Sequence, residues 1–188
     1  MTVTQQSAKH LREVFFGGNW TWSNVKDQLS DVDLDMATYK LDGFNTIAVL
    51  TFHIGYYVRA VLSVLEDQPL NASDKFSFDL PPLESAAQWN ALVAQTLSNA
   101  EKAAGMIAQL PDSRLEAIFV EEKYGTWFRN IHGLIEHTHY HLGQIAIIKK
   151  CTEPASGALR AKISDPRQAL MAPPLLRFRH ICVMYFHH

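Results

Sequence analysis

The chain has 188 residues and a formal net charge of −2 at pH 7, and 47% of its residues are hydrophobic. This length suggests one domain, with or without an appendage, and the apolar content argues against a disordered chain or a disulfide-stapled miniprotein. The near-neutral charge provides no broad basic surface for nucleic acid. Nine histidines against two cysteines direct any metal chemistry towards imidazole ligands.

The charge is unevenly distributed along the chain. Residues 1–150 carry a net charge of −5, whereas residues 151–188 carry +3 and contain both cysteines. We therefore expect one domain over residues 1–150 and an irregular C-terminal extension over residues 151–188 that is not a separate domain. The apolar and basic stretch Leu175–Phe186 is open to three interpretations: a membrane or partner segment, an arm over the domain, or non-native sequence. We favour an arm or extension without a catalytic role.

Three features favour a cytoplasmic protein without a membrane span. The polar start, Met1–His10, has no apolar core of a secretory signal. Residues 1–150 contain no cysteine, which suits a reducing compartment. The most apolar stretch, Gly43–Val58, is short for a spanning helix and contains Asn45 and His53.

Helical periodicity predicts short helices in the first part of the chain. They are Ser7–Phe16, a piece capped by Ser23, and one or two turns within Asp31–Lys40. The first strong signal is a helix capped by Asn45 that ends near Glu66.

A crossover loop is predicted over Gln68–Pro82, because this stretch holds three prolines. A long helix containing Trp89 follows, and Pro111 ends it. Asp112 or Ser113 can then cap a short helix. The last regular element is a helix over about Thr126–Lys150. No segment alternates as a strand does, so the sequence predicts an all-α helical bundle with four substantial amphipathic helices.

The last helix carries four histidines within ten positions. At about 100° per residue, His137 and His141 lie within about 60° of the centre of the apolar stripe, whereas His132 and His139 lie about 140–160° away. Two inward imidazoles at i and i+4 can bind one metal ion. The alternative is a hydrogen-bonded pair in the core.

His53 lies on the buried side of the helix that follows Asn45, and it is the remaining histidine within a strongly periodic segment. One histidine from one helix and a pair from another can form a metal site in the core of a bundle. Taken alone, His53 fits a hydrogen-bonded core residue better than a metal ligand. Together with the inward pair, it favours a three-histidine metal site.

Three histidines that leave a coordination position open are typical of catalytic zinc, whereas closed structural sites are rich in cysteine. Zinc or nickel is expected, with iron or cobalt as alternatives, because imidazoles do not distinguish these metals. The metal would lower the pKa of bound water or of a substrate thiol. Glu136 precedes His137 and should point away from it, so no general base is evident.

A family resemblance follows from this arrangement. The helix with His53, the proline-containing crossover, a second long helix and the ending His137-x3-His141-x-Gly143-Gln144 resemble the DinB/YfiT-like family of metalloenzymes. The resemblance spans about residues 7–150 and includes two further pieces of sequence, Trp20-x-Trp22 and Asn45-Thr46-Ile47.

The resemblance implies a four-helix bundle, often dimeric, with His53, His137 and His141 as ligands of a divalent metal. It also implies a thiol-dependent S-transferase or a hydrolase that acts on a low-molecular-weight thiol and a small electrophile, as a homodimer. Some relatives with assigned activity resemble a mycothiol-dependent isomerase. The alternative is a non-catalytic metal-binding or dimerisation module.

Other residues near the predicted ligands have two possible roles each. Tyr57 can line the pocket or pack in the core, and Gln144 can hydrogen-bond a ligand or lie on the surface. Gly143 is expected to permit close packing of helices. Three tryptophans are expected to be core or interface aromatics: Trp20, Trp22 and Trp127.

Overall fold

The computed structural model describes residues 1–152, and the predictions for the extension beyond them, the stretch Leu175–Phe186 included, lie outside the described residues. Within residues 1–152 the regular structure is helical apart from one isolated bridge, between Ile118 and Thr126, so the all-α prediction is confirmed. The α-helices are α1 Val3–Phe16, α2 Val25–Leu29, α3 Leu34–Thr38, α4 Ile47–Leu65, α5 Ala86–Ile107 and α6 Trp127–Thr152. The 3₁₀ helices are η1 Asp74–Phe76, η2 Asp112–Glu116 and η3 Glu122–Tyr124.

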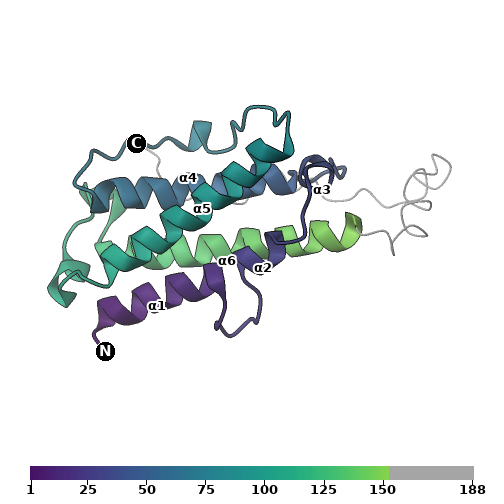
Figure 1. The fold of residues 1–188 in the computed structure, drawn as a ribbon. Coiled ribbons are helices and arrows are strands. Elements are labelled where there is room, and N and C mark those ends of the chain that lie inside the picture. The colour runs from purple at the N-terminus through teal and green to yellow at the C-terminus, as the bar shows by residue number, and fades with distance from the viewer. Residues whose placement is uncertain (153–188) are drawn as a thin grey trace, which may run out of the picture.

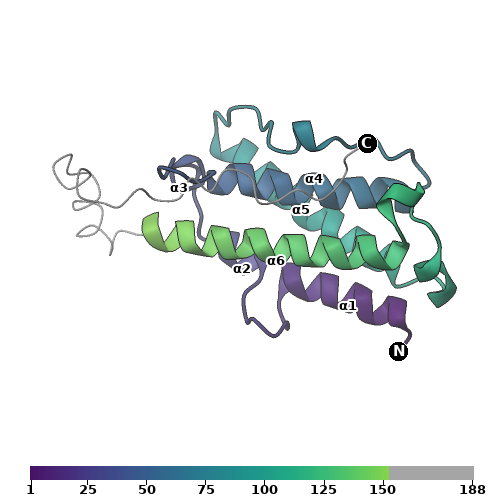
Figure 2. The ribbon, with the colours of Figure 1, turned by 180° about the vertical axis from the view of Figure 1, so that it is seen from behind.

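The four long helices α1, α4, α5 and α6 form a bundle. Helix α4 packs against α5 and α6, and α1 packs against the same two helices from the other side. Helices α1 and α6 run in one direction and α4 and α5 in the other (Figures 1 and 2). Because α4 and α5 are parallel, residues 66–85 must cross back along the length of α4, as the prolines in this stretch predicted.

Helix α4 contributes 12 of its 19 residues to the buried core. It is long and apolar enough to cross a membrane by length and composition, but 61% of that stretch is buried inside the bundle, as in a core helix. Arg59 is its one charged residue, and it pairs with Glu66 just beyond the helix end.

Local capping explains where the helices begin. Thr46, rather than Asn45, caps α4 by accepting a hydrogen bond from the Val49 amide at 3.2 Å. Asn24, rather than Ser23, caps α2 in the same way. In both cases the predicted cap is wrong by one residue, because a cap requires the oxygen to reach the amide three positions ahead.

Helix α1 begins four residues earlier than predicted. Thr2 and Gln5 form a reciprocal capping box, and Asp112 accepts hydrogen bonds from the amides of Val3 and Thr4. Asp112 therefore stabilises the start of a distant helix, whereas the 3₁₀ helix η2 that contains it has no side-chain cap.

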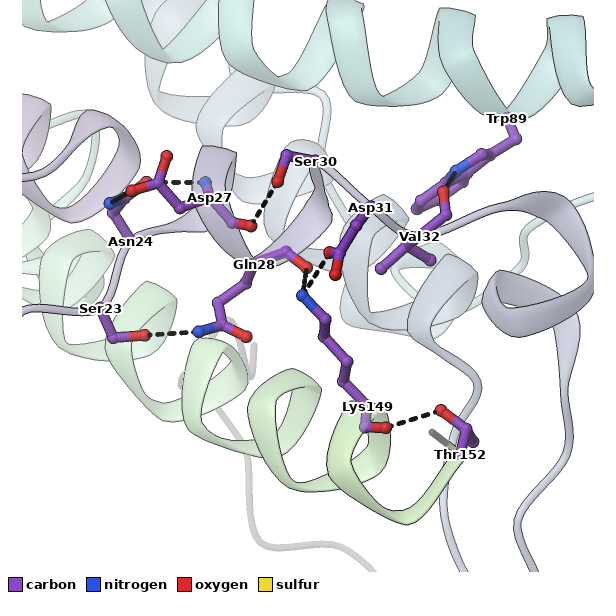
Figure 3. A network of polar contacts seen from close by, with 10 residues as sticks. All are labelled: Ser23, Asn24, Asp27, Gln28, Ser30, Asp31, Val32, Trp89, Lys149 and Thr152. Atoms are coloured by element: carbon purple, nitrogen blue, oxygen red, sulfur yellow. Dashed lines mark hydrogen bonds and ion pairs between the residues drawn. The ribbon is translucent and has the colours of Figure 1, made fainter. Parts of the chain in front are cut away.

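A polar network fixes the region between α1 and α4 to the end of α6 (Figure 3). Lys149 donates to the carbonyl of Gln28 at 3.2 Å and pairs with the carboxylate of Asp31. The buried indole of Trp89, near the start of α5, donates to the carbonyl of Val32 at 2.7 Å. These contacts hold the short helices across one end of the bundle.

The tryptophans divide between the two predicted roles, and one prediction about a glycine is wrong. Trp127 is buried in the core, whereas Trp20 is fully exposed and Trp22 nearly so, and both lie outside the core formed by residues 1–152. A Cβ atom added at Gly143 would meet no atom within 4 Å, so this glycine does not permit a close helix contact. The close contact is at Gly55 on α4, where an added Cβ would lie 2.6 Å from the Thr96 hydroxyl of α5.

Candidate metal centre

Helices α4 and α6 bring the three predicted histidines together in the core. His53 on α4 is 0% exposed, and His137 and His141 on α6 are 5% and 2% exposed. The pair on α6 shares one face because its members are four residues apart, and the packing of α4 against α6 places His53 opposite them.

The Nε2 atoms of the three rings converge. Nε2 of His137 lies 2.9 Å from Nε2 of His53 and 3.1 Å from Nε2 of His141. All three ligand atoms lie within 4.8 Å of one another. Nitrogen ligands of one tetrahedral zinc ion are about 3.3 Å apart, which is close to the two shorter distances. The cluster can therefore hold a divalent metal ion.

The outer ring nitrogens fix two of the tautomers. Nδ1 of His53 donates to the Ser77 carbonyl at 3.1 Å, and Nδ1 of His141 donates to Oε1 of Gln144 at 2.6 Å. Because these oxygens only accept, both histidines carry their proton on Nδ1 and direct an Nε2 lone pair into the cluster. Neutral histidines bound in this way are oriented as metal ligands require.

Hydrogen bonds alone cannot satisfy the ring nitrogens of all three histidines, and the conflict falls on His137. With its proton on Nε2, it donates into the cluster, but its buried Nδ1 is then an acceptor without a hydrogen-bond partner among the described residues. With its proton on Nδ1, three lone pairs face one another at close range. A cation bound to the three Nε2 atoms removes this repulsion, so the donor set fits a metal ion.

The environment keeps the cluster neutral. Burial and then the charge of His141 lower the pKa of His53 to about 4, although the Ser77 carbonyl and Asp74 act in the opposite direction. Burial and then the two neighbouring histidines lower the pKa of His137 to about 2. Burial also lowers the pKa of His141. Neutral imidazole is the form that binds metals.

Aromatic rings surround the cluster. The ring of Tyr57, predicted as a pocket residue, lies edge-on to His53 and His137 with centroids 5.1 and 4.7 Å apart, and its hydroxyl donates to Asp74. Phe78 stacks on His53 at 3.7 Å and Tyr140 lies edge-on to His141 at 5.0 Å. Tyr57 is buried, so it both packs in the core and contacts the candidate ligands.

The structure places the other histidines of residues 1–152 outside the cluster. His132 and His139 lie on the opposite side of α6 as predicted, but both are half-buried against α1 rather than fully exposed. His10 on α1 lies beside His139 with ring centroids 6.0 Å apart. A separate cavity of about 510 Å³ is lined by His10, His139, Gly143 and Trp20 but by none of the three clustered histidines.

Sequence reasoning missed three residues of the site. Ser77, Phe78 and Asp74 all lie in the crossover, where no helical periodicity relates them to α4. Ser77 contributes its backbone carbonyl, which any residue could provide, and so no signal in the sequence identifies it. The loop holds two aromatic residues, Phe76 and Phe78, and only the structure shows that Phe78 is the one that stacks on His53.

No family model, curated protein or solved structure matches this chain.

Proposed function

We propose that this protein binds a divalent metal through His53, His137 and His141, as a bundle metalloprotein of the DinB/YfiT-like kind. The observation that carries the proposal is the convergence of three buried Nε2 atoms, two of which have their lone pairs directed inward by hydrogen bonds at Nδ1. The H-x3-H-x-G-Q sequence on α6 supports the assignment, because Gln144 is the residue that orients His141.

Zinc or nickel is the proposed metal, and iron or cobalt can use the same three ligands. A divalent ion held by three histidines acts as a Lewis acid and keeps a coordination position for a small molecule. The chain's own residues hold the imidazoles in their neutral form, orient them through Ser77 and Gln144, and surround them with aromatic rings that limit access of water.

The proposed activity is that of a thiol-dependent S-transferase or a hydrolase, in which a low-molecular-weight thiol or water attacks a small electrophile. We further propose a cytoplasmic homodimer. The second candidate is a non-catalytic metal-binding module, and the nearly complete burial of all three histidines favours it, because a substrate must reach the ligands.

Metal analysis of protein purified without a nickel column tests the site. We expect about one divalent ion per chain in the wild type, and loss of the ion in His53→Ala and His141→Ala, because two imidazoles bind far more weakly than three. His132→Ala is the matched control, since His132 lies on α6 outside the cluster. Metal content by mass spectrometry and thermal melts of each variant provide the measurements.

Two results would contradict the metal site: wild-type protein without stoichiometric metal after exposure to zinc and nickel, or full metal content in both alanine variants. A panel of thiols and electrophiles then separates the two candidates. Turnover that disappears in His53→Ala supports the enzyme, and a metal-loaded protein without turnover supports the binding module.

A further inference from the structure

Two aromatic side chains that contact the histidine cluster are themselves exposed to solvent. Phe78 stacks on His53 with the rings 13° from parallel and is itself 36% exposed. Tyr140 covers His141 and is 46% exposed. Since the three histidines are at most 5% exposed, a metal ion or small molecule reaches Nε2 only if a covering side chain moves, and these two are the exposed ones in ring contact with the cluster.

The two covers differ in how firmly the backbone holds them. Tyr140 lies in the middle of α6, whose backbone is hydrogen-bonded and packed against α1 and α4. Phe78 lies in residues 71–79, between Leu70 and Leu80, which pack against the core. Of residues 71–79 only Ser77 is buried, and the one regular element is the single turn η1. Hydrogen bonds from three side chains of α4 hold this segment: Tyr56 to Ser73, Tyr57 to Asp74 and His53 to the Ser77 carbonyl. Apart from these it has few buried contacts, and an irregular segment of this kind opens more readily than a packed helix.

We infer that residues 71–79 form a gate over the metal centre, with Phe78 as the side chain that closes it. The inference rests on the proposed function, because it assigns a path for the metal and its ligands to that same site. Opening displaces Phe78 from His53 and separates the Ser77 carbonyl from Nδ1 of the same ring. Closure therefore covers the site and orients His53 in one movement.

Gate closure and metal binding are thermodynamically coupled. A histidine bound to a metal through Nε2 almost always donates from Nδ1 to an acceptor, and the gate provides this acceptor to His53. Because coupling is reciprocal, a bound metal favours the closed gate as much as the closed gate favours the metal. The amides of residues 71–79 should then exchange with deuterium more slowly in the metal-bound protein.

Chemical modification of the metal-free protein tests the gate without requiring a metal. Diethyl pyrocarbonate acylates accessible neutral imidazoles, and mass spectrometry locates the product. We expect His53 to react about three- to tenfold faster in Phe78→Ala than in the wild type, the factor that corresponds to loss of one aromatic pair. Phe76→Ala is the matched control, because Phe76 is an exposed phenylalanine of the same segment that does not contact His53. Phe78→Leu keeps an apolar cover and should restore slow modification.

Removal of the metal by a chelator provides the second measurement. Metal-loaded Phe78→Ala should release its ion about three- to tenfold faster than the wild type, with Phe76→Ala unchanged. Equal modification rates and equal release rates in Phe78→Ala and Phe76→Ala would overturn the gate and leave the metal site intact. A wild type that binds no metal would overturn the proposed function, while faster acylation of His53 in Phe78→Ala would still support the gate.

Discussion

The role of each histidine in the cluster depends on the partner of its outer nitrogen. His53 and His141 have acceptors at Nδ1, so their Nε2 atoms are lone-pair donors to a metal, and the Nδ1 atom of His137 has no hydrogen-bond partner among the described residues. Gln144 is therefore a positioning residue, whose amide oxygen holds the tautomer of His141. Its own amide donates to the Tyr140 hydroxyl at 3.3 Å, which keeps the oxygen directed at the ring.

Replacement of Gln144 should weaken metal binding without changing stoichiometry. We expect Gln144→Ala to lower affinity about 10- to 100-fold, as is typical when the partner of a ligating histidine is lost. Gln144→Glu retains an acceptor oxygen and should bind at least as tightly as the wild type. Competition titrations against a chromophoric chelator measure both variants. Wild-type affinity in Gln144→Ala would show that His141 needs no orienting partner.

At the scale of elements, the position of the candidate site depends on how closely α4 approaches α5 and α6. Gly55 lies two residues after His53 and faces Thr96 of α5, which is 2% exposed. No larger side chain fits between the two helices at this point, because an added Cβ would lie 2.6 Å from the threonine oxygen. Gly55 therefore sets the distance between α4 and α5 beside the candidate ligand.

Substitution of Gly55 should destabilise the fold, and a second substitution should restore it. Gly55→Ala is expected to lower the free energy of unfolding by about 1–3 kcal/mol through overpacking, and urea unfolding measures this change. Thr96→Ala removes the oxygen in contact and should recover most of this loss in the double variant. Gly105→Ala is the control, because an added Cβ there meets no atom within 4 Å and alanine favours the helix by about 1 kcal/mol. Equal effects at Gly55 and Gly105 would contradict the close contact.

At the scale of the whole molecule, burial of the cluster makes stability depend on pH. In the unfolded chain these histidines titrate near 6.5, whereas burial lowers the folded-state pKa of His53 to about 4 and of His137 to about 2. Below pH 6.5 the unfolded chain therefore binds more protons than the folded protein does. The free energy of unfolding must fall as the pH decreases through this range.

The metal-free protein should lose stability progressively between pH 6.5 and pH 4. His53 contributes about 3 kcal/mol to this loss, because its pKa differs between the two states, and His137 adds to it in the same direction. Above pH 6.5 neither loss occurs, because both histidines are neutral in the folded and in the unfolded state. Urea unfolding over a pH series measures the slope, which should be smaller in His53→Ala than in the wild type. The same slope in both proteins would show that His53 does not contribute to the pH dependence of stability.

Much of the architecture follows from the sequence because helical periodicity is local. The inward direction of His137 and His141 requires only the rotation per residue and the apolar stripe of one helix, and both are buried as predicted. The prolines after α4 likewise predict the crossover. Cap positions were wrong by one residue at Asn45 and Ser23, because several polar residues at each helix start can act as caps.

Only the tertiary structure decides the features that depend on which segments meet. The Ser77 carbonyl reaches His53 because the crossover lies along α4, and any residue could supply a carbonyl there. Gly55 rather than Gly143 permits a close helix contact, since the deciding fact is the neighbour on the other helix. The periodicity of α4 and α6 identifies which histidines face the core. Their meeting within hydrogen-bonding distance results from packing between helices far apart in the chain.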